Sequence, residues 1–206
     1  AVELSMGLAA ALALSYLLGA IPTGYVLVRG IKRMDIRTVG SGNIGATNAL
    51  RAAGPWAGGA VLILDILKGL AAATLIPRAL VPEPGPAVRL VCGAAAVAGH
   101  TYSCFLRFEG GKGVATTIGA LLGASPAVAG WFLGVWAVVF ALSRYVSLGS
   151  VVAAAAMPLS QIVLRADGLE IFAGAVVATL IIVRHRANLQ RLLAGTEHRA
   201  WSQKRH

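Results

Sequence analysis

Residues 52–76 read Ala-Ala-Gly-Pro-Trp-Ala-Gly-Gly-Ala-Val-Leu-Ile-Leu-Asp-Ile-Leu-Lys-Gly-Leu-Ala-Ala-Ala-Thr-Leu-Ile, with only Asp65 and Lys68 charged. A helix that crosses a bilayer needs about 20 mostly apolar residues, so this stretch is long enough to span a membrane. Of the 206 residues, 57% are hydrophobic and 13% are charged, and the mean hydropathy is +0.76. A soluble domain is about one quarter charged. The composition therefore predicts an all-α integral membrane protein.

Six further apolar stretches surround this one, and their number sets the expected topology. If all seven span and the N-terminus lies outside, the inner loops hold 14 Lys and Arg residues and the outer loops hold 3. If the short stretch Val114–Ala124 is re-entrant, the counts become 8 and 9. Because Lys and Arg collect in cytoplasmic loops, we predict seven transmembrane helices, several of them short, with the N-terminus outside and the C-terminus in the cytoplasm. They form a single polytopic membrane domain over residues 1–206, and the other stretches are Leu4–Val28, Ala87–Leu106, Pro126–Leu142, Val146–Leu164 and Leu169–Val183.

The net charge is +10. In a soluble protein this excess would suggest nucleic acid. In a membrane protein, basic loops orient the chain and contact anionic lipid. We therefore expect membrane lipid and no nucleic acid as a partner, and we expect some of the cations to bind phosphate.

A glycine-rich loop precedes residues 52–76 and reads Gly40-Ser41-Gly42-Asn43-Ile44-Gly45, followed by Thr47, Asn48 and Arg51. It matches the dinucleotide fingerprint Gly-x-Gly-x-x-Gly, but that motif needs a strand before it and a βαβ unit around it. Here the preceding segment is polar and the following one is a membrane helix. Glycines free backbone N–H groups to bind an anion, and the Arg51 guanidinium matches a phosphate. We predict a phosphate site, with a flexible turn as the alternative.

A second glycine run occupies Gly110-Gly111-Lys112-Gly113 and opens the stretch Val114–Ala124. It is not a Walker loop, because Gly113 rather than Ser or Thr follows Lys112. A lysine between glycines is conformationally costly unless the loop must reach a ligand. The alternative is a positive charge that only orients the chain.

The polar segment Arg184-His185-Arg186-Ala187-Asn188 follows the last apolar stretch. His185 and Asn188 are three residues apart and would share a helix face. The basic residues here, and Arg191, are expected to anchor the chain at the membrane surface.

Two smaller features stay open at the level of sequence. Asp65 and Lys68 lie inside a predicted span, where charges are costly and often functional, although a pair at this spacing can also neutralise itself. Ser147 could donate to a ligand or could cap a helix.

These motifs, in this order, make the chain similar to the membrane-integral bacterial acyl-phosphate:glycerol-3-phosphate acyltransferases (PlsY-type). The resemblance covers almost the whole chain. It rests on Val39–Asn48 with Arg51, on Asp65-Ile66-Leu67-Lys68-Gly69, on Gly99-His100 through Phe108 into Gly110–Thr116, on Arg144-Tyr145-Val146-Ser147-Leu148, and on Arg184–Asn188.

The resemblance implies transfer of a fatty acyl group from long-chain acyl phosphate to glycerol 3-phosphate, giving lysophosphatidic acid, without CoA or acyl carrier protein as donor. It places the enzyme in the bacterial cytoplasmic (inner) membrane, as a monomer in our prediction, with its active site facing the cytoplasm. No cofactor and no metal are expected. The implied catalytic residues are Ser41, Arg51, Lys112, His185 and Asn188. The expected substrate-binding residues are Gly40, Gly42, Asn43, Gly45, Thr47, Asn48, His100, Gly110, Gly111, Gly113, Thr116 and Ser147.

The residues leave two questions open. The proton of the attacking hydroxyl could pass to His185 or to a phosphate oxygen of the acyl donor, and we favour the latter. A transporter of organic anions is the alternative class, but such proteins show inverted repeats and broken helices at mid-membrane. This chain shows no inverted repeat, and its polar motifs collect on one predicted face.

Overall fold

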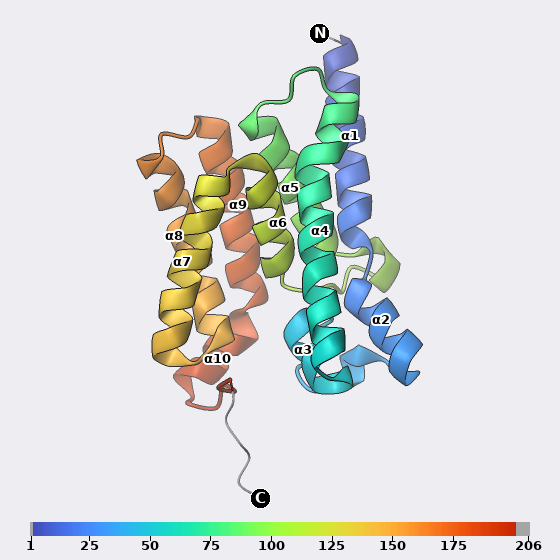
Figure 1. Cartoon of the computed structure of the whole chain (residues 1–206), viewed down its shortest axis with the longest axis vertical. Helices are drawn as coiled ribbons and strands as arrows, with labels where there is room; N and C mark the ends of the chain where they lie inside the picture. The colour runs from blue at the N-terminus through green and yellow to red at the C-terminus, as the bar shows by residue number, and fades with distance from the viewer. Residues whose placement is uncertain (1, 201–206) are drawn as a thin grey trace, which may run out of the picture.

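The computed structural model describes residues 2–200, with side chains from residue 6 onward, and all regular elements in that range are helical. Figure 1 shows the long helices lying side by side along one axis, with the N-terminus at one end and α2, α3 and α10 at the other. The elements are α1 (Val2–Ala20), α2 (Thr23–Lys32), η1 (Ile36–Thr38), α3 (Ala46–Ala53), α4 (Pro55–Leu80), α5 (Pro86–Thr101), η2 (Cys104–Leu106), α6 (Val114–Ala124), α7 (Pro126–Ser143), α8 (Val146–Val163), α9 (Gly168–Arg184) and α10 (Arg186–Leu193).

Four segments of the described chain are long and apolar enough to cross a membrane: Met6–Lys32, Pro55–Leu80, Pro126–Ser143 and Val146–Val163. A fifth follows if α9 and α10, which are bent by 56° at their junction, count as one span. The helices α5 and α6 have 16 and 11 residues and are shorter than a usual span. An all-helical bundle is confirmed, while seven spans and the N-outside orientation stay predictions.

The first apolar stretch is not the single helix that Leu4–Val28 suggests. Helix α1 ends at Ala20 and α2 begins at Thr23. Pro22 lies between them, and a proline has no N–H for the helix ladder and clashes with the preceding turn. The third stretch also ends early, because the chain leaves α5 after Thr101 and folds as an irregular segment up to Gly113.

Glycines allow the central helices to approach closely. A Cβ atom at Gly69 of α4 would overlap the Thr116 carbonyl of α6, and one at Gly119 of α6 would overlap the Ile66 carbonyl of α4. The same relation joins α1 to α5, where a Cβ at Gly19 would overlap the Ala96 carbonyl. Small residues at such contacts are typical of helices packed within a membrane, where dispersion contacts rather than expulsion of water hold them together.

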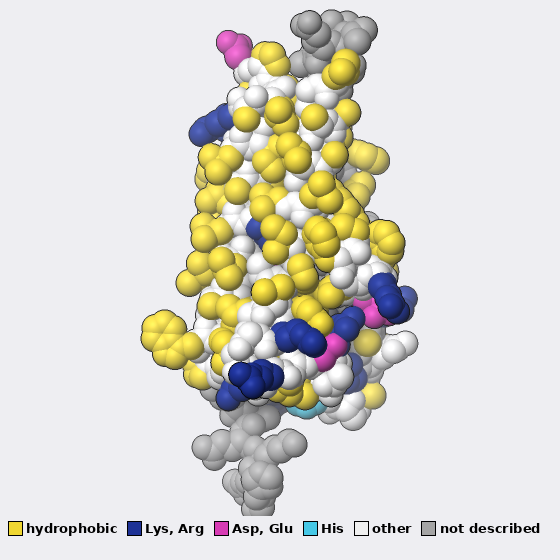
Figure 2. All heavy atoms as spheres, turned by 90° about the vertical axis from the view of Figure 1, so that its right-hand side faces the viewer, with side chains coloured by type: hydrophobic (Ala, Val, Ile, Leu, Met, Phe, Trp, Pro, Cys, Tyr) yellow, Lys and Arg dark blue, Asp and Glu magenta, His cyan; other side chains and the backbone are white. Residues whose placement is uncertain are grey.

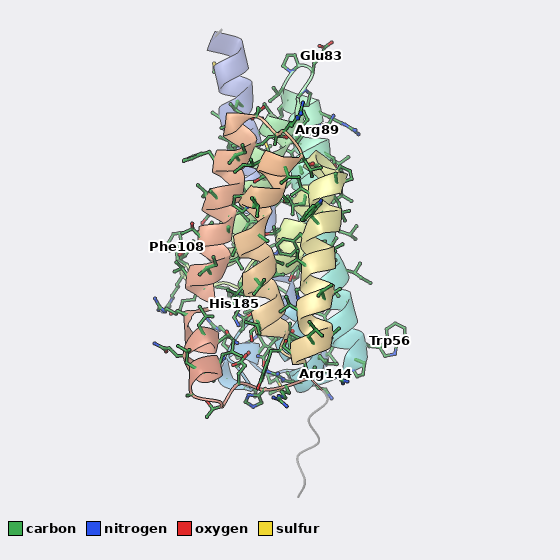
Figure 3. All side chains as sticks on the ribbon, turned by 90° about the vertical axis from the view of Figure 1, so that its left-hand side faces the viewer. Trp56, Glu83, Arg89, Phe108, Arg144 and His185 are labelled. Atoms are coloured by element: carbon green, nitrogen blue, oxygen red, sulfur yellow. The ribbon has the colours of Figure 1, made fainter. Side chains whose placement is uncertain are left out.

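The surface divides along the same axis. Figure 2 shows hydrophobic side chains over most of one face, with Lys and Arg side chains gathered towards the end that carries α2 and α3. Trp56, at the start of α4, is 92% exposed and projects outward at that end (Figure 3). Tryptophan is enriched where a protein crosses the boundary between lipid and water. A polar site is therefore expected at the basic end of the bundle.

Candidate active site

The first glycine loop is organised by one buried side chain. Asn48, 2% exposed, donates from its Nδ2 to the carbonyls of Ile36 (3.1 Å), Val39 (3.0 Å) and Asn43 (2.9 Å). Its Oδ1 accepts the N–H of Ser41 at 3.0 Å. All four bonds lie within the loop and its flanks. Asn48 therefore fixes the loop from inside, and its predicted contact with substrate stays a prediction.

The loop presents other groups to solvent. Gly40 and Gly42 have φ values of 58° and 68°, a left-handed conformation that favours glycine. This conformation turns the chain so that the Ser41 side chain is exposed. Asn43 accepts the Gly45 N–H on its Oδ1 at 2.8 Å. Helix α3 starts immediately after this turn and carries the exposed Arg51.

The second glycine loop is fastened on both of its edges. The N–H groups of Gly110 and Gly111 donate to the carbonyls of Thr101 (3.1 Å) and His100 (2.9 Å) at the end of α5. Their own carbonyls accept from the Arg184 guanidinium of α9, at 2.7 Å for Gly110 and 3.2 Å for Gly111. Arg184 is therefore part of the loop's support as well as a basic residue at a helix end.

Side chains from four parts of the chain form a hydrogen-bonded group around Lys112 that we call the Lys112 cluster: Lys112, Ser147, Asn188, Arg191 and Glu197. The Lys112 ammonium donates to the Asn188 Oδ1. The Glu197 carboxylate accepts from Asn188 Nδ2 (2.6 Å), Ser147 Oγ (2.8 Å) and Arg191 Nε (2.7 Å). The second glycine loop, the start of α8, α10 and the segment after α10 thus form one polar site.

Burial and neighbouring charges shift the pKa values of two residues in this cluster, Lys112 and Glu197. Burial, together with the positive charges of Arg191, Arg184 and Arg51, lowers the pKa of Lys112 to about 8, although Glu197 opposes the shift. Burial raises the pKa of Glu197, but the hydrogen bonds from Asn188, Ser147 and Arg191 outweigh it, so the net pKa is lowered. Because the charge of Arg51 also acts on Lys112, the helix that follows the first glycine loop contributes to the electrostatic environment of the second.

His185 lies where α9 bends into α10 (Figure 3), and only 3% of it is exposed. Its Nδ1 lies 2.8 Å from the carbonyl of Ile181. A carbonyl only accepts, so we assign the proton of the neutral ring to Nδ1, which leaves Nε2 as an acceptor. Asn188 follows within one turn of α10. The predicted sharing of one face by His185 and Asn188 fits this arrangement.

Several predicted residues lie outside the Lys112 cluster. His100 is 4% exposed, and its ring lies beneath the second loop. Thr116 is fully buried, and its carbonyl lies at the contact between α6 and α4. Gly113 has a φ of 84° and precedes α6. Thr47 is exposed at the start of α3. Their roles with substrate stay predictions.

The expectation that Arg191 serves only as an anchor is wrong, because its guanidinium bonds the Glu197 carboxylate inside the cluster. Sequence reasoning also missed Glu197 and the role of Arg184. Arg184 acquires its partners from a distant loop. Glu197 bonds the distant Ser147 and also Asn188 and Arg191, nine and six residues before it, across the end of α10. Neither set of contacts follows a regular helix spacing. Among the described residues, no group of three or more His, Cys, Asp or Glu side chains could hold a metal ion.

The fold and this site together define a membrane-type helical bundle with a cationic polar site at one end. Residues 9–195 match the family model for glycerol-3-phosphate acyltransferase. The glycerol-3-phosphate acyltransferase of Desulforudis audaxviator (strain MP104C) is 46% identical over 186 residues, which cover 90% of this chain and 92% of the relative. Glycerol-3-phosphate acyltransferase 2 of Moorella thermoacetica (strain ATCC 39073 / JCM 9320) is 47% identical and covers 92% of this chain and 95% of its own length.

Two solved structures agree with these relatives. Both are crystal structures of PlsY (YgiH), an integral membrane glycerol 3-phosphate acyltransferase. The glycerol 3-phosphate form is 42% identical, with a TM-score of 0.84, and the match covers 92% of this chain and 94% of that one. The lysophosphatidic acid form is 40% identical, with a TM-score of 0.80 and coverages of 92% and 93%. The chain therefore belongs to the glycerol-3-phosphate acyltransferase family, as an enzyme of the PlsY type.

Proposed function

We propose that the chain transfers a fatty acyl group from acyl phosphate to the C1 hydroxyl of glycerol 3-phosphate. The hydroxyl oxygen attacks the acyl carbon, a new ester C–O bond forms, and the bond between that carbon and the phosphate oxygen breaks. Inorganic phosphate leaves with the electron pair of that bond, and an oxygen of the same phosphate takes the proton of the attacking hydroxyl. The products are lysophosphatidic acid and phosphate. Because acyl phosphate is a mixed anhydride with a good leaving group, the reaction needs no acyl-enzyme intermediate.

The observation that carries this proposal is the gathering of Lys112, Asn188 and the charge of Arg51 in one region. Both substrates carry phosphate, and such donors bind phosphate and stabilise the negative charge that develops on the acyl oxygen and the leaving group. Ser41 lies on the same loop that leads into α3 and Arg51. Holding two substrates together also supplies rate by proximity.

We assign the proton acceptor to a phosphate oxygen of the acyl donor. The cations would hold that phosphate next to the attacking hydroxyl. Burial and the charge of Lys112 lower the pKa of His185 to about 4, which weakens its imidazole as a base. In this proposal His185 is not the base, and it orients the substrate. If His185→Gln binds glycerol 3-phosphate as the wild type does but loses its turnover number, the imidazole is the base and this assignment is wrong.

The wider setting follows from the basic end of the bundle. We place that end at the cytoplasmic face of a bacterial inner membrane, where glycerol 3-phosphate is available from water. The acyl chains of donor and product would lie between helices, in contact with lipid. The enzyme acts as a monomer in this proposal, because the Lys112 cluster is built from side chains of one chain.

A product assay tests the proposal. Purified protein in lipid, supplied with palmitoyl phosphate and glycerol 3-phosphate, should release lysophosphatidic acid and phosphate in equal amounts. Palmitoyl-CoA as donor should give none. Product from CoA alone would overturn the assigned donor, and vesicle uptake of glycerol 3-phosphate without product would favour the transporter.

A further inference from the structure

Three ionisable side chains that the proposed chemistry does not use are buried together between α4 and α5. Asp65, Lys68 and His100 are 1%, 5% and 4% exposed. The Lys68 Nζ lies 2.9 Å from Asp65 Oδ1 and 2.8 Å from His100 Nδ1. Buried charges within a candidate span are costly unless they are paired and hydrogen-bonded. The pair neutralises itself, but self-neutralisation does not explain the histidine.

The break in the first span supplies the remaining partners of this group. Thr23 donates its hydroxyl to Asp65 Oδ1 at 2.6 Å, and Lys68 donates to the Ile21 carbonyl at 3.1 Å. Both residues flank Pro22. Backbone groups freed at membrane depth must find partners in the protein, and Lys68 satisfies one of them. The group thus ties α4 to the break between α1 and α2.

The geometry fixes how the His100 ring is held. An ammonium group only donates, so Nδ1 accepts from Lys68, and the ring proton belongs on Nε2. The distance from Nδ1 to Asp65 Oδ1 is 3.6 Å, too long for a hydrogen bond. The ring is therefore fastened at one edge by Lys68.

The opposite edge of the ring supports the second glycine loop. A Cβ atom built on Gly111 would overlap the ring, and its three nearest heavy atoms, Nε2, Cε1 and Cδ2, all belong to His100. The Gly111 N–H donates to the His100 carbonyl at 2.9 Å. The next residue is Lys112. A displacement of the ring would therefore move the support of the residue before the catalytic lysine.

We propose that Asp65, Lys68 and His100 are positioning residues, which hold the His100 ring as a platform for Gly111 and thereby set the place of the Lys112 ammonium. The proposal rests on the proposed function of Lys112. It gives a role to buried charges within a candidate span, in place of the direct contact with substrate predicted for His100, and it makes the break at Pro22 part of the same support.

The substitution His100→Asn separates positioning from stability. An asparagine Oδ1 can take the place of Nδ1 and accept from Lys68, so the buried charge stays satisfied. The shorter side chain leaves Gly111 without its platform. We expect a thermal midpoint close to that of the wild type, with kcat/KM for glycerol 3-phosphate lowered by about tenfold to a hundredfold, the range that small misplacements cause. The matched control is Gln161→Met, which removes a buried hydrogen bond to the Glu170 carbonyl between α8 and α9. It should lower the midpoint and leave KM unchanged.

A second pair of variants tests the contact itself. Gly111→Ala places a methyl group against the ring and should lower activity, and adding His100→Asn should restore part of that loss because the ring is gone. Unchanged kinetics in His100→Asn, or a double variant that is no better than Gly111→Ala, would overturn the proposal. If His100→Asn does not fold, Thr23→Val should raise KM, because Asp65 loses a donor, and Thr23→Ser should not. Equal kinetics in those two variants would also overturn it.

Failure of the proposed function would be visible separately. A wild-type protein that makes no lysophosphatidic acid from palmitoyl phosphate would refute the donor assignment. Titration calorimetry of glycerol 3-phosphate against the same variants needs no donor. Weaker binding in His100→Asn, with wild-type binding in Gln161→Met, would support the positioning role even then.

Discussion

At the scale of single residues, Lys112 lies in a glycine-rich loop, yet hydrogen bonds hold both that loop and the Lys112 side chain in place. Its backbone neighbours are bonded to α5 and to Arg184, and its ammonium is bonded to Asn188. Burial and three arginines bring its pKa to about 8. The positive charge of Lys112, on which we propose that phosphate binding depends, is therefore lost as the pH rises through about 8.

This pKa predicts how binding changes with pH. A phosphate that binds the ammonium form binds fully below the pKa and loses affinity as the pH rises through it. KM for glycerol 3-phosphate should rise about tenfold per pH unit above about pH 8. Ionisation of the substrate phosphate does not contribute to this rise in KM, because the second ionisation of a phosphate group has a pKa of about 6. Lys112→Arg, whose charge persists beyond pH ~12, should show no break at pH 8 in a steady-state series. A break retained in that variant would assign it to another group.

Replacing each of three cations at the same end of the bundle by alanine should lower activity by different amounts. Lys112→Ala should lower kcat/KM by about 10²-fold or more, in the range of a lost donor to a developing oxyanion. Arg191→Ala should cost less, because it acts through Glu197. Arg186→Ala changes an exposed residue and is the control, with activity near that of the wild type. Equal losses in Lys112→Ala and Arg186→Ala would mean that the loop lysine serves only to orient the chain.

At the scale of helices, the apolar stretches of the sequence correspond to the observed helices, because length and hydrophobicity are local properties. The apolar run Leu4–Val28 is divided into α1 and α2, because Pro22 interrupts the helix that the run favours. Glu197 could not be found in the same way, since it lies after the end of α10 and the turn that brings it back to Asn188, Arg191 and the distant Ser147 forms only in the folded chain. Asn48 is predicted from the sequence to bind substrate, and the structure shows its side chain holding its own loop through four hydrogen bonds.

The contact between α4 and α6 should be sensitive to a single methyl group. Gly69→Ala would place a Cβ against the Thr116 carbonyl, and overpacking of this kind costs about 1–3 kcal/mol. Gly59→Ala, on the same helix with nothing within 4 Å of the added atom, is the matched control. Thermal unfolding in one detergent should show a lower midpoint only for Gly69→Ala. A similar midpoint for both variants would mean that the helices can separate at little cost.

At the scale of the whole molecule, the loops before α3 and between α5 and α6 lie close enough to share electrostatic interactions. We predict that they lie on one side of the membrane. The connection between α4 and α5 lies at the opposite end (Figure 1). This arrangement agrees with seven spans, but it would also hold if Val114–Ala124 were re-entrant, because the two topologies differ only in the segments after α6.

Accessibility labelling can establish the topology. In a background of Cys92→Ala and Cys104→Ser, a cysteine introduced at Ser41 or at Thr196 should react with an impermeant maleimide only from the cytoplasmic side. A cysteine at Glu83 should react only from outside. Labelling of positions 41 and 196 from opposite sides would refute seven spans and would separate the two halves of the site.

The Glu197 carboxylate has a consequence for biogenesis. It follows α10, the last helix of the described residues, yet it accepts hydrogen bonds from Asn188 and Ser147 in the Lys112 cluster. A nascent chain with every earlier helix already inserted would still lack this side chain. In a chain synthesised only as far as α10, Asn188, Ser147 and Arg191 would therefore lack the carboxylate that accepts from all three, and the Lys112 cluster would be incomplete.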